Sequence, residues 1–249
     1  MRLAHRMENL GTETAFELLA KAKALEAQGK DIIHLEIGEP DFDTPSHIVE
    51  AAINALREGW THYGPSQGLP DVREALARHF TRTRGIQARP EQVVVTAGAK
   101  PIIFYSILAL VQEGDEVIYP DPGFPIYESM VRFCGAKPVP MRLLEAKGYH
   151  PDLDDLASKV NQRTRMIILN SPQNPTGSIL SRQELDAIAG MVRQRDDIYV
   201  LSDEVYSSIL YTGEHYSIAS LPGMLERTIL LDGFYKAYAM TGWRLGYAH

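Results

Sequence analysis

From residue 93 onward, short apolar runs rich in β-branched residues alternate with segments of helical periodicity. The runs that we interpret as strands are 93–96, 116–119, 137–142, 166–170, 198–202, 228–232 and 244–247. Strands that alternate with helices form α/β folds around a mostly parallel sheet. We therefore predict three layers, with helices on both faces of a seven-stranded, mostly parallel sheet.

Helix boundaries are marked by proline, glycine and capping residues. Proline near the start and glycine just past the end delimit helices over 44–58 and 69–84. Ser181 and Glu184 have the spacing of a capping box, in which each side chain bonds the backbone of the other residue, and so predict a helix start. Residues 32–37 are predicted to be a short strand or an extended segment.

The composition is that of a protein with a well-buried core, and it argues against several partners. The chain has 249 residues, 45% of them hydrophobic, and a formal net charge of -7 without a Lys/Arg cluster interleaved with aromatic residues. We therefore predict no nucleic-acid partner. No apolar run has transmembrane length, and Cys134 is the only cysteine, so no intrachain disulfide can form. We expect a cytoplasmic protein without a membrane segment.

Polar residues and glycines follow several of the predicted strands. Gly98, Asn174, Asp203 and Lys236 each come directly after an apolar run or within a few residues of one. Parallel sheets bind ligands in the crevice at the carboxyl ends of their strands, so these four residues mark the predicted site. The eight histidines lack metal-ligand spacing, and no G-x-G-x-x-G occurs, so we predict neither a metal centre nor a dinucleotide site.

Lys236 and Asp203 carry the most specific chemistry. Lys236 lies in a turn between two apolar runs, and Asp203 directly follows another. A lysine that forms an imine and an aspartate that pairs with a pyridinium nitrogen are the two groups that pyridoxal 5'-phosphate (PLP) requires of a protein. The pair therefore predicts a PLP site.

Three segments around these residues occur in a characteristic order. They are N-P-T-G at 174–177, S-D-E-V-Y at 202–206 and D-G-F-Y-K-A-Y-A-M-T-G-W-R-L-G-Y at 232–247. Together they resemble the class I/II aminotransferases of PLP fold type I, from about Ile32 to the last residue. The resemblance implies amino-group transfer between an L-amino acid and a 2-oxo acid. Another PLP reaction, such as β-elimination, and a PLP-binding fragment without turnover remain alternatives.

The resemblance implies catalytic roles for Lys236, Asp203 and Tyr206. Lys236 forms a Schiff base with PLP and then transfers a proton, while Asp203 keeps the pyridine nitrogen protonated. Tyr206 and Asn174 hydrogen-bond the phenolic oxygen of the cofactor, and Asn174 also belongs to the substrate site. The structural alternatives are a surface lysine, a turn cap at Asp203 and a plain Asn-Pro turn at Asn174.

Further residues correspond to cofactor contacts of the family. Gly98, Ala99 and Lys100 open a helix whose backbone N–H groups and dipole suit a phosphate. Arg244 resembles the arginine that pairs with this phosphate through its planar fork. Phe124 corresponds to the aromatic residue that stacks on the pyridine ring. A surface ion pair for Arg244 and a packing role for Phe124 are the alternatives.

Two residues extend the predicted site, and one departs from the family pattern. Gly38 matches a position whose backbone N–H meets the substrate carboxylate. Tyr63 resembles a tyrosine that reaches the phosphate of the neighbouring subunit, which implies a homodimer; a packing role is its alternative. Tyr235 stands directly before the lysine, where the family usually keeps a small residue beside the phosphate.

The resemblance also implies a domain layout. Residues 1–40 are expected to form an N-terminal arm and helix that pack with the small domain of the family, and residues 41–249 the PLP-binding large domain. Members of the family continue into a C-terminal small domain, which carries an arginine that grips the substrate carboxylate. We expect this chain to lack that domain, either as a fragment or as a natural truncation.

Overall fold

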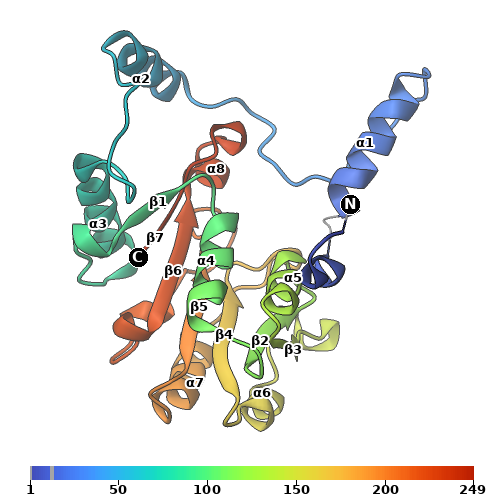
Figure 1. Ribbon diagram of the computed structural model, residues 1–249, viewed down its shortest axis with the longest axis vertical. Coiled ribbons are helices and arrows are strands. Elements are labelled where there is room, and N and C mark those ends of the chain that lie inside the picture. The colour runs from blue at the N-terminus through green and yellow to red at the C-terminus, as the bar shows by residue number, and fades with distance from the viewer. Residues whose placement is uncertain (1, 12–13) are drawn as a thin grey trace.

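A seven-stranded sheet organises the molecule (Figure 1). The computed structural model describes residues 2–11 and 14–249, so Met1, Thr12 and Glu13 of the predicted arm lie outside the described residues. The strands are β1 (Val94–Thr96), β2 (Glu116–Asp121), β3 (Lys137–Arg142), β4 (Thr164–Asn170), β5 (Tyr199–Asp203), β6 (Thr228–Gly233) and β7 (Gly246–Ala248).

The strand order is β1-β7-β6-β5-β4-β2-β3. Pairs among β3, β2, β4, β5 and β6 are parallel, whereas β7 runs antiparallel to both of its neighbours, β1 and β6. The predicted mostly parallel sheet is confirmed. Since β1 and β6 both run antiparallel to β7, they point the same way. The carboxyl ends of β1 and β6 therefore lie at the same edge of the sheet.

Helices cover both faces of this sheet, as predicted (Figure 1). Successive strand residues point to opposite faces, so Val117 and Ile168 pack in one apolar cluster while Ile118 and Ile167 pack in another. The first cluster includes residues of α4 (Lys100–Leu110) and α5 (Ile126–Phe133), and the second includes residues of α6 (Leu153–Lys159) and α7 (Arg182–Arg193).

The helix α3 (Pro70–Arg84) covers the second face at the β7 end of the sheet. Phe80 of α3 packs with Leu230 of β6, whereas the next strand residue, Leu231, belongs to the cluster of α4 and α5. The helix ends where Gly85 adopts the left-handed conformation, with φ of 67°. This end brings Arg84 to the carboxyl edge of the sheet.

Local signals account for most of the helix boundaries. The predicted capping box is present, with Ser181 and Glu184 bonding each other's backbone at the start of α7. The helix α6 was not predicted, because seven residues are too few to show a helical period. Its start does carry a signal: the Asp152 side chain accepts hydrogen bonds from the backbone N–H groups of Asp154 and Asp155.

The first helices stand apart from the sheet (Figure 1). α1 (Thr14–Glu26) and α2 (Ser46–Arg57) contain no buried residue. Residues 32–37 form no strand and contain a bend at Glu36. The loop before α2 contacts the segment after Lys236, where Trp243 Nε1 donates a hydrogen bond to Thr44 Oγ1 at 3.0 Å.

The remaining elements are short. They are α8 (Phe234–Ala237) and the 3-10 turns His5–Asn9, Pro90–Gln92, Glu145–Lys147, Ile218–Ser220, Leu225–Arg227 and Thr241–Trp243. Within the described ranges, no helix is both long enough and apolar enough to cross a membrane.

Candidate active site

The carboxyl edge of the sheet collects the four residues that sequence analysis singled out. Asp203 is the last residue of β5, and Lys236 lies in α8, directly after the neighbouring strand β6. Gly98 follows β1, which ends at this edge, and Asn174 follows β4 within the next loop. The chain therefore brings an amine, a carboxylate, an amide and a glycine turn to one edge.

Asp203 is a buried carboxylate with neutral partners. Within the described part of the chain, its oxygens accept hydrogen bonds from the Tyr127 hydroxyl at 2.6 Å and the Val205 backbone N–H at 3.4 Å. Burial raises the pKa of Asp203 to about 6, and the neighbouring charge of Glu204 adds to the rise, while the two hydrogen bonds oppose it. The carboxylate is therefore well placed to receive a cationic ligand.

Tyr127 is a site residue that sequence analysis missed. It is fully buried, and burial together with the charge of Asp203 raises the pKa of its phenol well above the usual range, so it remains a hydrogen-bond donor. Its ring meets that of Phe124 edge to face, with 5.7 Å between centroids. Phe124 precedes the N-cap of α5, Pro125, and Tyr127 is the second residue of the helix, so the two rings meet where the chain enters α5.

The Lys236 side chain is half-buried beside Gly38 and Tyr206. Its Nζ donates to the carbonyl oxygen of Gly38, so the structure brings the predicted Gly38 to the lysine through its carbonyl group. Burial lowers the pKa of Lys236, and the negative charge of Glu39 opposes this shift. Nζ lies 5.7 Å from the centroid of the Tyr206 ring, whose pKa is raised to about 12 by burial and by the charge of Asp203.

Arg244 packs closely against the start of α4, where we expect an anion cradle. Gly98 has φ of +89°, and a Cβ built there would lie 2.3 Å from Nη2 of Arg244, so only glycine leaves room for this guanidinium. Gly246 packs equally closely, because its Cβ would lie 2.6 Å from the backbone nitrogen of Ala99. Arg244 therefore lies against the N-terminal end of an eleven-residue helix, a combination that suits a phosphate.

Lys100, the first residue of that helix, turns toward aromatic rings. Its Nζ lies 5.6 Å from the centroid of Phe124 and 5.3 Å from that of Phe16. These distances are within the range of cation–π attraction. The side chain of Lys100 thus approaches the predicted stacking residue, while its backbone belongs to the helix start.

The Asn174 loop is tied to Asp203 through Asn170. The backbone N–H of Asn174 donates to Asn170 Oδ1 at 2.8 Å, and Asn170 Nδ2 donates to the carbonyl oxygen of Asp203 at 3.1 Å. Asn170 ends β4 directly beside Asp203 in the parallel register. This amide was not predicted, because its role depends on which strands are neighbours.

Tyr63 lies apart from these contacts, whereas the ring of Tyr235 lies beside Lys236, with 6.0 Å between its centroid and Nζ. Tyr63 is fully exposed, on the segment between α2 and α3. Tyr235 folds back over the backbone of Gly233, where a Cβ would come within 2.3 Å of the tyrosine Cε1. Within the described residues, no group of three or more His, Cys, Asp or Glu side chains could hold a metal ion.

The sequence and the fold of this chain are similar to those of known proteins. A family model described as Aminotransferase class I and II matches residues 30–249. A probable aspartate/prephenate aminotransferase from Aquifex aeolicus is 42% identical over 247 residues, which cover 98% of this chain and 62% of that protein. An aspartate aminotransferase from Thermus thermophilus, solved with maleate, has a TM-score of 0.96 and 41% identity over 100% of this chain and 64% of its own.

A second solved structure shows the same likeness with a different activity. An alanine aminotransferase from Pyrococcus furiosus has a TM-score of 0.92 and 36% identity, over 100% of this chain and 63% of its own. This chain thus spans a little under two thirds of the length of the relatives it matches. The family resemblance predicted from the segments around Asn174, Asp203 and Lys236 is confirmed, and the chain belongs to the aminotransferase class I and II family.

Proposed function

We propose that this protein transfers an amino group between an L-amino acid and a 2-oxo acid with PLP as its cofactor. The observation that carries the proposal is the pairing of buried Asp203 with Lys236, whose pKa burial lowers, at the ends of adjacent parallel strands. A carboxylate for a ring nitrogen and an amine that is neutral part of the time are what this cofactor requires.

The residues present fit this cofactor. The space that Gly98 leaves for Arg244, at the start of α4, supports a phosphate site that also uses the backbone of Ala99 and Lys100. Asp203, whose carboxylate accepts from the Tyr127 hydroxyl, would hold a proton on the pyridine nitrogen. When bound, PLP supplies a ring that withdraws electrons from the carbon that bears the amino group.

Other side chains orient the ring. Tyr206 and Asn174 would hydrogen-bond its phenolic oxygen, and Phe124 would lie against its face. Lys236 would hold the cofactor covalently, and its Nζ, once the substrate amino group has replaced it, would take the proton from the substrate α-carbon. Gly38, whose carbonyl already accepts from Lys236, supports a substrate position beside this amine.

The names of the relatives support aspartate as the first amino donor to test. Aspartate appears in the names of the Aquifex aeolicus and Thermus thermophilus proteins, and alanine in that of the Pyrococcus furiosus protein.

We also propose that residues 41–249 form the cofactor-binding domain and that residues 1–40 form an arm. We further propose that the protein is a cytoplasmic homodimer. The single cysteine, Cys134, supports a reducing compartment.

The test is covalent capture of the cofactor, followed by turnover. Purified protein mixed with PLP is expected to absorb visible light, and sodium borohydride is expected to fix the cofactor on Lys236, as located by peptide mapping. In a separate sample that is not reduced, L-aspartate is expected to remove the visible band and release oxaloacetate. Lys236→Ala serves as the negative control, and an adduct on another lysine would refute the assignment.

A further inference from the structure

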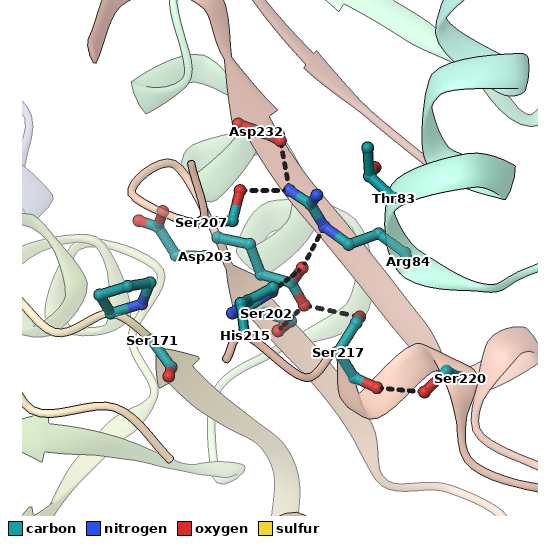
Figure 2. Close-up of polar contacts among 12 residues, drawn as sticks. Thr83, Arg84, Ser171, Ser202, Asp203, Ser207, His215, Ser217, Ser220 and Asp232 are labelled. Carbon is teal, nitrogen blue, oxygen red and sulfur yellow. Dashed lines mark hydrogen bonds and ion pairs between the residues drawn. The ribbon is translucent and has the colours of Figure 1, made fainter. Parts of the chain in front are cut away.

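A buried guanidinium lies behind the candidate active site (Figure 2). Arg84 is the last residue of α3, and its side chain is only 3% exposed. Removing a guanidinium from water is costly unless partners compensate it, so its contacts determine its role.

Three side chains receive hydrogen bonds from Arg84, as Figure 2 shows. Nε donates to Glu204 Oε2 at 2.7 Å, and Nη2 donates to Asp232 Oδ2 and to Ser207 Oγ, each at 2.6 Å. The two carboxylates are as buried as the guanidinium, with 1% and 7% of their side chains exposed. Only the planar fork of arginine can reach three such partners at once.

Two of the partners adjoin residues of the proposed site. Glu204 directly follows Asp203, and Ser207 directly follows Tyr206. Because adjacent residues at a strand end point to opposite faces, Asp203 faces Tyr127 of α5 while Glu204 faces α3. The guanidinium therefore contacts the Asp203–Tyr206 segment from behind.

The third partner begins the segment that carries Lys236. Asp232 lies near the end of β6, and its second oxygen, Oδ1, accepts the backbone N–H of Gly233 at 2.7 Å. Gly233 is the residue that caps α8, the short helix that contains Lys236. Asp232 thus links the guanidinium directly to the backbone that starts this helix.

Glu204 is fixed by contacts other than Arg84. Its Oε1 accepts hydrogen bonds from Ser202 Oγ at 2.8 Å and Ser217 Oγ at 2.7 Å, and its Oε2 lies 2.8 Å from His215 Nε2. These hydrogen bonds to both of its oxygens hold the Glu204 carboxylate in one orientation. Arg84 therefore joins this fixed carboxylate to Asp232, just beyond the last backbone pair of the two strands, Asp203 with Leu231.

We propose that Arg84 is a positioning residue, which holds the Asp203–Tyr206 segment and the Lys236 segment in the mutual arrangement that the cofactor requires. The proposal deepens the proposed function and rests on it. Arg84 touches neither cofactor nor substrate, and it acts through Glu204, Ser207 and Asp232.

The test compares Arg84→Lys with Arg82→Lys, the same substitution at an exposed position of the same helix. Lysine keeps the charge but has one nitrogen in place of the two, Nε and Nη2, that hold the partners of Arg84. Hydrogen exchange without cofactor, read by mass spectrometry, is expected to accelerate in peptides covering 203–209 and 232–238 while peptides from β2 and β3 keep the parent rates. Arg82→Lys is expected to leave every peptide unchanged.

Cofactor binding gives the second measurement. In Arg84→Lys the Kd for PLP is expected to rise about tenfold or more, and the pH midpoint of the visible band to move by about half a unit or more. Ser207→Ala removes one contact and leaves both ion pairs, so it is expected to fold and to show a smaller change in the same direction, about threefold in Kd.

Two results would overturn the proposal. One is parent exchange rates, Kd and midpoint in both Arg84→Lys and Ser207→Ala. The other is faster exchange throughout the sheet with an unchanged midpoint, which is the signature of a residue that only stabilises the fold. If the parent protein takes up no PLP, the proposed function fails, while the exchange pattern still decides the role of Arg84.

Discussion

At the scale of single residues, the buried charge of Asp203, which the proposed function needs, lowers the stability of the folded protein. Its pKa rises from 3.8 to about 6 because the carboxylate is buried beside neutral partners. The folded protein therefore holds this proton more tightly than the unfolded chain, and folding loses stability as the pH rises from the unfolded pKa to the folded one. The loss amounts to at most about 3 kcal/mol above pH 6.

Asp203→Asn should remove this conflict in the protein without cofactor. The amide carries no charge and can still accept the Tyr127 hydrogen bond, so the variant is expected to be more stable than the parent at pH 8. The advantage should shrink below pH 6 and vanish near pH 4, as measured by urea unfolding across this range. Amino transfer by the same variant is expected to fall far more than PLP affinity, because the ring nitrogen loses its anionic partner.

A surface carboxylate provides the matched control for Asp203. The hydrogen bond from Arg195 lowers the pKa of Asp197, so the stability from this pair is present at neutral pH and lost as acid protonates the carboxyl group. Asp197→Asn should therefore change stability with the opposite sign at pH 8. A loss of stability at pH 8 in both variants would contradict the assignment of Asp203 as a destabilising charge.

Tyr235 places a bulky side chain beside the proposed phosphate site. Its ring folds over Gly233, and burial together with the charges of Asp203 and Tyr206 raises the pKa of its phenol strongly. A bulky side chain next to a closely packed anion usually costs affinity, so Tyr235→Ser is expected to tighten PLP binding by at most about a hundredfold. An absorbance titration measures this, and weaker binding would instead show that the phenol donates to the phosphate.

At the scale of elements, the docking of β7 on the start of α4 depends on Gly246. A Cβ at this position would lie 2.5 Å from the carbonyl carbon of Gly98, whereas a Cβ at Gly242 would meet nothing within 4 Å. Gly246→Ala is therefore expected to lower the free energy of unfolding by about 1–3 kcal/mol and to weaken PLP binding, while Gly242→Ala changes both little. Denaturation and cofactor titration check this, and equal behaviour of the two variants would contradict the packing.

The elements that the sequence predicted well are those with local causes. The strand β4 is buried on both faces and so appears as a continuous apolar run, and α7 begins at a capping box that two side chains form by themselves. The last predicted strand, 244–247, is displaced to β7, Gly246–Ala248, because Arg244 adopts a left-handed conformation that no strand contains.

The residues that the sequence left unassigned act through tertiary contacts. Asp203 and Lys236 could be assigned to the candidate site because the chemistry of the proposed cofactor restricts the residue types that serve it. Tyr127 and Arg84 belong to helices on opposite faces of the sheet and meet the site only after β5 and β6 pair. Their residue types are common, so composition and spacing carry no signal for roles that depend on the order of strands.

At the scale of the whole molecule, the first 69 residues expose many large apolar side chains. Ile33 is 85% exposed, Leu35 is 89% exposed, and Tyr63 is fully exposed. Exposed apolar surface of this extent is typical of an interface. Tyr63 supports the proposed homodimer, in which it reaches the phosphate of the other subunit, whereas Ile33 and Leu35 belong to the proposed arm of residues 1–40.

Tyr63→Phe tests this arrangement, because it removes one hydroxyl and keeps the ring. A hydrogen bond to a charged phosphate contributes about 1.5–3 kcal/mol, so the Kd for PLP is expected to rise about tenfold or more while the protein stays dimeric by light scattering. Tyr211→Phe, at another highly exposed tyrosine, is the matched control. A monomeric parent with full cofactor affinity would exclude a shared site.

The pairing of β1 with β7 has a consequence for synthesis on the ribosome. Val94 of β1 pairs with Ala248 of β7, and within the described sheet β1 has no other neighbour. A nascent chain that has already released β1 to β6 therefore cannot pair β1 into the sheet until the residues of β7 emerge. The turn at Gly98 and the guanidinium of Arg244 come together only at that late moment, so a translating chain acquires its anion cradle after most of the sheet has formed.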